Sequence, residues 1–221
     1  MTQYEKKSIL IAKAKTHLEI IKNRLIKLAN DKDSLIRAEA IEILADFYDG
    51  DIDRQILKAL NDKNNLVKIN ALDAIKLPNN TSVVLEKISL FLKSRNWLIK
   101  AYAIEALGRN HALQYKKDIE NILKKTQNDE LKVRIYYALI EFGEMQYLDK
   151  LLKLLNNDFY RVRIATSNIL YYLVDKNNVI GILEHLNKRF DIELEHSVKE
   201  TLRGTIKDIE NLFSTRDNGI L

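Results

Sequence analysis

The chain has no cysteine, and among its 221 residues it has only one proline, Pro78, and six glycines. The absence of cysteine excludes disulfides, thiolate metal sites and a cysteine nucleophile. Tight turns and β-hairpins need more glycine and proline than this, so the composition indicates helices. The start, MTQYEKKSIL, has no long apolar run behind a basic segment, and no stretch reaches the roughly 20 apolar residues of a membrane span. We therefore expect a cytoplasmic protein.

The positive charge is unevenly distributed along the chain. The formal net charge is +5, which could indicate nucleic-acid binding. Residues 1–30 hold seven lysines and arginines against two glutamates, and the rest of the chain is neutral. The basic surplus thus belongs to the first helical segment and not to the chain as a whole.

The chain repeats one short pattern. Residues 36–44 read IRAEAIEIL, residues 67–75 read VKINALDAI, and residues 99–107 read IKAYAIEAL. Each copy begins with an apolar residue, the anchor, followed by a long and usually basic residue. Six anchored copies follow at spacings of 31, 32, 34, 29 and 32: Ile36-Arg37, Val67-Lys68, Ile99-Lys100, Val133-Arg134, Val162-Arg163 and a degenerate Leu194-Glu195. Such internal periodicity is the signature of a repeat architecture.

Each copy predicts a helical hairpin: helix A, a polar turn, then helix B, which contains the anchor. Positions 4, 7, 8 and 11 after the anchor lie on one stripe of a helix, and a small residue such as Ala40 at the first of these allows close approach. In the fourth copy Tyr137 occupies this position, as if one residue were inserted. One hairpin cannot bury its apolar face alone, so the hairpins must stack.

These features resemble the HEAT family of α-solenoid repeats over residues 17–210. In that family an aspartate in the turn lies six residues before the arginine of helix B, and these charges form a ladder between neighbouring repeats. The turns at Ser94, Asn128 and Asn157 would supply neutral acceptors, and Arg189 with Glu195 inverts the pattern, as suits a terminal cap. The resemblance implies a ladder of Asp31, Arg37, Asp62, Lys68, Lys100, Arg134 and Arg163.

The predicted fold is an all-α, right-handed α-solenoid of about six HEAT-like helical hairpins in a single domain, 1–221. Residues 1–16 form a basic helical lead-in, 17–213 the six hairpins and 214–221 a frayed tail. The lead-in either caps the end of the solenoid or contacts nucleic acid or an anionic membrane surface.

The concave face should be lined by helix B at positions 3, 6 and 10 after the anchor. Its first half is acidic and its second half carries tyrosines. The partner-binding residues predicted in this way are Glu39, Glu42, Asp46, Asn70, Asp73, Tyr102, Glu105, Arg109, Tyr136, Asn168 and Tyr172. Carboxylates attract basic partners, and tyrosines are common at interface hot spots. The alternatives are an ordinary solvated helix face and tyrosines that replace core residues.

Catalytic patterns give no basis for an enzyme. His185 and His196 are too far apart for a helical metal site, the His-Glu dipeptides of HEAT-like di-iron hydroxylases are missing, and no nucleotide-binding loop is present. We expect no cofactor. The predicted function is non-catalytic binding of a basic protein, as in a bacterial immunity protein that inhibits a nuclease toxin. The alternatives are a nucleic-acid-binding or alkylation-repair protein that uses the basic first helix, and a HEAT-like lyase or chaperone. The oligomeric state stays open.

Overall fold

The computed structural model describes residues 17–47, 50–75 and 82–217, and none of these residues lies in a β-strand. The chain divides into two compact units, Met1–Ile88 and Ser89–Leu221. The helices of the first are 17–28, α2 (Ser34–Leu44), α3 (Gly50–Ala59), α4 (Asn65–Ala74) and α5 (Ser82–Ser89). Those of the second are α6 (Trp97–Arg109), α7 (Lys116–Lys125), α8 (Asp129–Glu141), α9 (Leu148–Lys153), α10 (Tyr160–Leu173), α11 (Val179–Ile192) and α12 (His196–Asp217).

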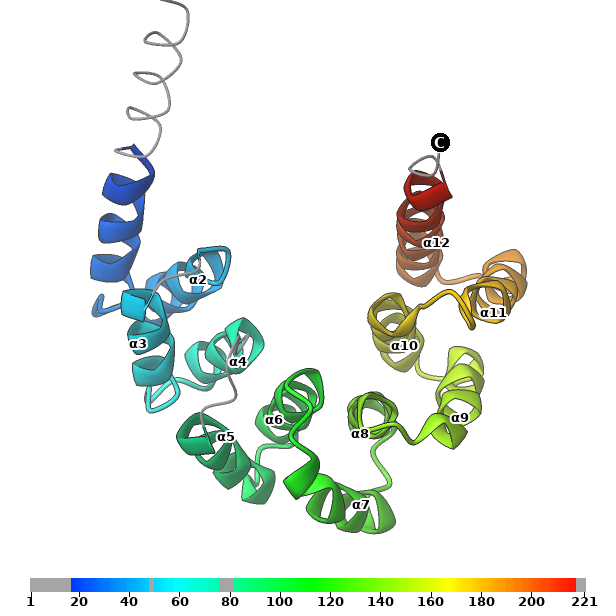
Figure 1. The fold of residues 1–221 in the computed structure, drawn as a ribbon, viewed down its shortest axis with the longest axis horizontal. Helices are drawn as coiled ribbons and strands as arrows, with labels where there is room; N and C mark the ends of the chain where they lie inside the picture. The colour runs from blue at the N-terminus through cyan, green and yellow to red at the C-terminus, as the bar shows by residue number, and fades with distance from the viewer. Residues whose placement is uncertain (1–16, 48–49, 76–81, 218–221) are drawn as a thin grey trace, which may run out of the picture. The chain divides into compact units, whose positions relative to one another are not determined.

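The fold is an all-α helical repeat. Short 3-10 turns extend several hairpins: η1 (Leu90–Lys93), η2 (Leu113–Tyr115), η3 (Met145–Tyr147) and η4 (Leu154–Asn156). In the second unit α6, α8, α10 and α12 pack side by side in one layer, and α7, α9 and α11 form another (Figure 1). In the first unit α2 packs against α4 in the same way. The predicted alternation of helices A and B is therefore present in both units.

Hydrogen bonds in the turns define where each helix B begins. Asp33, Asn64, Asn96 and Asn128 are the N-caps of α2, α4, α6 and α8, and each accepts a backbone N–H from the first turn of its helix. Such caps satisfy donors that the helix itself leaves unpaired. The side chain of the residue two positions before each of these caps accepts the backbone N–H of the cap residue, and the acceptors are Asp31, Asp62, Ser94 and Thr126. Before α10 and α12, the same bond runs from the N–H of Phe159 to Asn157 and from the N–H of Glu195 to Glu193.

This register corrects two of the predicted anchors. The anchor lies three residues after the cap, so the fourth anchor is Leu131 and not Val133, and the sixth is Val198 and not Leu194. Val198 is fully buried, whereas Leu194 is 97% exposed. The anchors are therefore spaced by 31, 32, 32, 31 and 36 residues. The basic residue after the fourth anchor is Lys132, and Arg134 occupies another position of its helix.

Two arginines join successive turns. Arg37 donates to both carboxylate oxygens of Asp62, at 2.7 and 2.8 Å, and to the carbonyl oxygens of Asp31 and Lys32. Its hydrogen bond lowers the pKa of the Asp62 carboxyl, and the nearby charge of Lys68 acts in the same direction. The ladder therefore joins the cation of one repeat to the turn carboxylate of the next.

The second such junction is buried. Arg163 donates to both carboxylate oxygens of Glu193, at 2.8 and 2.9 Å, and to the carbonyl oxygens of two residues in its own turn. Burial acts to raise the pKa of Glu193, but the hydrogen bond from Arg163 opposes it. The backbone N–H of Glu195 and the side chain of Arg189 add further bonds and hold this pKa at about 2. The sequence reading had overlooked Glu193.

At the junction between the fourth and fifth repeats, the carboxylate comes from the first turn of helix B and not from the turn of the next repeat. Lys132 binds Asp129 at 2.7 Å, and the amide of Asn157 donates to the other oxygen of Asp129, also at 2.7 Å. The neutral turn residue is thus linked to the preceding cation through a carboxylate in the first turn of α8. Among the described residues, no hydrogen bond or ion pair joins the side chain of Lys100 to a turn.

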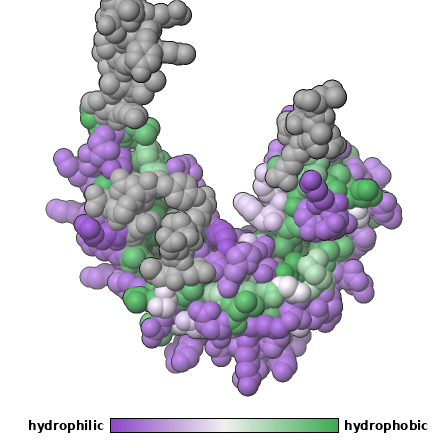
Figure 2. All heavy atoms as spheres, in the orientation of Figure 1, coloured by the Kyte–Doolittle hydropathy of each residue, from purple (hydrophilic) through white to green (hydrophobic). Residues whose placement is uncertain are grey.

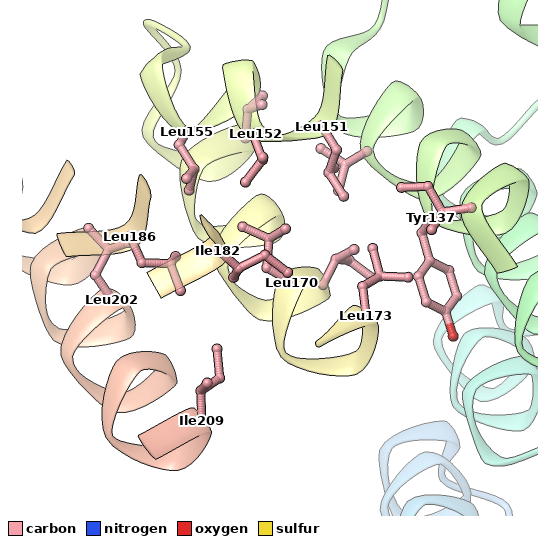
Figure 3. Packing of buried hydrophobic residues seen from close by; sticks show 14 of the residues in the cluster. Tyr137, Leu151, Leu152, Leu155, Leu170, Leu173, Ile182, Leu186, Leu202 and Ile209 are labelled. Carbon is pink, nitrogen blue, oxygen red and sulfur yellow. The ribbon is translucent and has the colours of Figure 1, made fainter. Parts of the chain in front are cut away.

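The core of the second unit lies between its two layers. Leu151, Leu152 and Leu155 extend from α9 and η4 toward Leu170 and Ile182, and Tyr137 closes one end beside Leu173 (Figure 3). Hydrophilic residues cover the outer side of α7 and α9 (Figure 2). In the described part of the chain, no helix combines the length and the apolar character needed to cross a membrane.

We expect replacement of Arg163 by alanine to lower the free energy of unfolding by about 3 kcal/mol or more, because Glu193 would stay buried with part of its compensation lost. Arg203→Ala is the control, since Arg203 pairs with Glu200 at the exposed surface and should cost less than about 1 kcal/mol. Urea denaturation followed by circular dichroism measures both. Equal losses would contradict a structural role for the buried junction.

We expect Gly108→Ala to destabilise the protein by about 1–3 kcal/mol. A Cβ atom at Gly108 of α6 would lie 2.6 Å from the Cα of Ala138 of α8. Gly181→Ala on α11 is the matched control, because its Cβ would meet nothing within 4 Å and alanine favours the helix. Thermal unfolding of the two variants should move in opposite directions.

Candidate functional site

The first unit carries an acidic face on α2 and α4. It consists of the exposed side chains of Glu39, Glu42, Asp46 and Asp73. Asn70 lies among them, half-buried, and donates to the carbonyl oxygen of Ala38 at 2.9 Å. The face thus places three carboxylates on two helices that pack together, with Asp46 two residues beyond the end of α2.

On α2, the carboxylates of this face have few partners. Across the described residues, no ion pair involves Glu39 or Asp46, and Glu42 accepts only a long 3.4 Å hydrogen bond from Asn70. Arg37, on the same helix, is held by Asp62 on the turn side. The acidic face therefore keeps its negative potential toward solvent.

Apolar side chains accompany the carboxylates, and the sequence analysis missed them. Leu35 on α2 and Leu66 on α4 each precede the anchor of their repeat and are 60% and 43% exposed. Leu35 is four residues from Glu39, and Leu66 is four from Asn70, so each shares a helix face with these polar groups. An apolar residue before the anchor in the first three copies was the available signal, since Leu98 repeats it.

The second unit has a different surface on its helices B. Glu105, predicted to be exposed, is buried, and the prediction that it lines an open acidic groove is wrong. It pairs with Arg134 of α8 and lies 3.8 Å from Arg109, one turn along α6. Arg134 also lies over the ring of Tyr102, 5.3 Å from its centroid. Two arginines therefore neutralise the one carboxylate here.

The corrected register also explains the tyrosines of α8. Tyr136 does not lie on the helix-B face; its ring stacks on Tyr147 of η3, with centroids 5.6 Å apart. The residues three, six and ten positions after Leu131 are Arg134, Tyr137 and Glu141. Burial raises the pKa of the Tyr137 hydroxyl, with a further contribution from Glu141, and burial also raises the pKa of Glu141. These groups belong to a closely packed polar cluster and not to an acidic groove.

The helix-B surface of α10 is open. Asn168 and Tyr172 are exposed, as their register requires, and Tyr172 is the more exposed of the adjacent pair, with its ring edge-to-face on Tyr171 at 5.4 Å. Such aromatic side chains offer rigid contact area at low entropic cost. Among the residues described, no group of three or more histidine, aspartate or glutamate side chains is arranged to hold a metal ion.

Comparison with known proteins adds little to this geometry. No protein-family model and no curated protein matches the chain. Among solved structures, an engineered protein from the Northeast Structural Genomics Consortium matches with a TM-score of 0.39 and 15% identity, over 86% of this chain and 96% of its own. A designed armadillo repeat protein matches with a TM-score of 0.41 and 14% identity, over 84% and 98%. The helical-repeat assignment therefore rests on the chain's own hairpins.

We expect Glu105→Ala to destabilise the protein by about 3 kcal/mol or more, because Arg134 and Arg109 would be left partly buried beside each other. Glu39→Ala should change stability by less than about 0.5 kcal/mol, since that carboxylate is exposed. Urea midpoints for the two variants provide the test. Similar midpoints would mean that Glu105 is not the centre of a buried pair.

Proposed function

We propose that this chain is a non-catalytic protein-binding module that holds a basic protein against the acidic face of its first unit. The observation that carries the proposal is the set of exposed carboxylates on α2 and α4, with Leu35 and Leu66 beside them. Carboxylates attract cations over several ångströms and fix orientation, and exposed apolar side chains supply contact energy. A surface with both is suited to a protein partner.

The same charges disfavour nucleic acid at this surface. A phosphate backbone is bound by lysine and arginine with release of counterions, and exposed carboxylates repel it. The basic surplus of residues 1–30 falls largely on residues 1–16, which lie outside the described part of the chain. Nucleic-acid binding would therefore have to use that segment and is an outcome of the experiment below.

A non-catalytic role is supported by the state of the ionisable groups in the second unit. Glu105 forms ion pairs with arginines, and burial raises the pKa of the Tyr137 hydroxyl further above neutral pH. Groups held in this way are poor general bases. The narrower role of an immunity protein rests on charge alone: a nuclease toxin needs a basic surface to hold its substrate, and such a surface would complement the acidic face.

We further infer that the repeats are of the HEAT type. A lysine or arginine follows every corrected anchor, and a side-chain acceptor lies five residues before each one. The bonds from Arg37 to Asp62 and from Arg163 to Glu193 join neighbouring repeats in the manner which the family resemblance implies. This pattern supports the narrower assignment within the helical-repeat class.

The test is charge reversal. A chain with Glu39, Glu42 and Asp73 replaced by lysine should lose its partner in an affinity pull-down from nuclease-treated extract of the source organism, with mass spectrometry to identify retained proteins. The control chain carries Asp118→Lys, Glu184→Lys and Asp191→Lys, at exposed positions of α7 and α11, so its net charge changes equally. A basic protein retained by the wild type and the control, and lost from the first variant, is the expected result.

Two outcomes would overturn the proposal. Retention of the same proteins by the reversed chain would show that the acidic face is not the binding surface. Material that disappears on nuclease treatment would indicate nucleic acid and direct attention to the basic segment. Circular dichroism of all three chains must first show equal helix content.

A further inference from the structure

The first repeat leaves apolar residues exposed that every later repeat buries. The anchor and the residue seven positions after it are Ile36 and Ile43 in α2, and they are 37% and 48% exposed. The corresponding side chains in later repeats are only 0–7% exposed: Val67, Ala74, Ile99, Ala106, Leu131, Ala138, Val162, Ile169, Val198 and Thr205. We call the strip formed by Ile36 and Ile43 the open edge.

Packing explains the difference. Within each unit, these two positions lie on the side of helix B that faces the preceding helix B; Ala138 of α8, for example, meets Gly108 of α6. In the described residues no helix B precedes α2, so its strip faces solvent. Helix 17–28 of the same hairpin also exposes Leu18, Ile20 and Ile21, each by at least half. Terminal repeats normally present a polar outer face, so an apolar edge of this size indicates a covering element.

We propose that residues 1–16 of this chain pack against the open edge and cap the first repeat. This segment lies outside the described residues, and its sequence fits the edge in two ways. It contains the apolar run Ile9, Leu10, Ile11 and Ala12, and its Lys6, Lys7, Lys13 and Lys15 against Glu5 give it a net charge of +3. Both properties complement an apolar strip that lies next to carboxylates.

The carboxylates beside the open edge favour residues 1–16 over a second copy of the chain as the covering element. Glu39 on α2 and Asp46, just beyond the end of α2, follow Ile36 and Ile43 by three residues, so they border the open edge. A two-fold pairing of two open edges would bring these carboxylates close to their own copies, since an isologous interface repeats the same patch. The basic segment meets the same carboxylates with opposite charge.

The connection has sufficient length. Helix 17–28 and α2 are joined by the short turn 29–33, so they run in opposite directions. Residue 17 is therefore at the Ile43 end of α2. Ile36 and Ile43 are about 10 Å apart along the axis of α2, and sixteen residues extend about 24 Å even when they are helical. Residues 1–16 are therefore long enough to reach both side chains. Covalent attachment also gives the segment a high effective concentration at this edge. The proposed cap meets Glu39 and Asp46, which also belong to the acidic face, and leaves Glu42 and Asp73 uncovered. The experiment below does not depend on partner binding.

A thiol-accessibility experiment tests the cap in the full chain, which has no cysteine of its own. Ile43→Cys places a reporter on the open edge, and Val83→Cys places a control thiol at a 73% exposed site of α5. Each is made with the natural segment and with Ile9→Ser, Leu10→Ser and Ile11→Ser together. We expect the position-43 thiol to react with a maleimide about tenfold more slowly with the natural segment, because local opening then limits access, while the position-83 thiol reacts equally in both.

The outcomes separate the possible occupants. Equal, fast reaction of the position-43 thiol in both backgrounds would overturn the proposal, and protection that disappears on dilution would show that a second copy covers the edge. Because cysteine at position 43 removes part of the apolar strip, amide exchange of the chain with its natural Ile43 gives a second measurement. Peptides covering α2 should exchange faster when the segment carries the three serines, and an unchanged rate would also contradict the cap.

Discussion

The contact between one helix B and the next is the interaction on which the structure depends. Within each unit, a helix B that follows another buries its anchor and the residue seven positions on against its predecessor, and the small residues at Gly108 and Ala138 show how close this approach becomes. A hairpin of about thirty residues has too little apolar surface to fold alone. The ion pairs between turns then align neighbouring hairpins. They depend on the helix packing and do not substitute for it as the source of stability.

Much of the fold could be predicted because the repeat is periodic and helical spacing is regular. The hairpins, the first three anchors and the fifth anchor all follow from apolar residues at helical intervals. The fourth anchor could not be assigned from that pattern alone, because Leu131-Lys132 and Val133-Arg134 both pair an apolar with a basic residue. The cap residue decides between them: Asn128 precedes Leu131 by three, as Asp33 precedes Ile36.

The surface residues were harder to predict, because exposure depends on partners that lie elsewhere in the sequence. Glu105 has the helix position of Glu42, yet Arg134 from the next helix B covers it. Tyr136 was assigned to the binding face through the two-residue register error and in fact stacks on Tyr147. Glu39, Glu42, Asp46 and Asp73 remain exposed where their register places them, and whether they bind a partner stays a prediction.

The near-constant interval between anchors has a consequence for how such a chain can change during evolution. Four of the five intervals are 31 or 32 residues, and each copy carries its own turn acceptor and following cation. Loss or duplication of one complete copy would therefore bring a cation next to another turn acceptor and leave the stacking surfaces matched. The length of the exposed helix-B surface can change in whole steps, each adding or removing one set of surface side chains without redesign of the core.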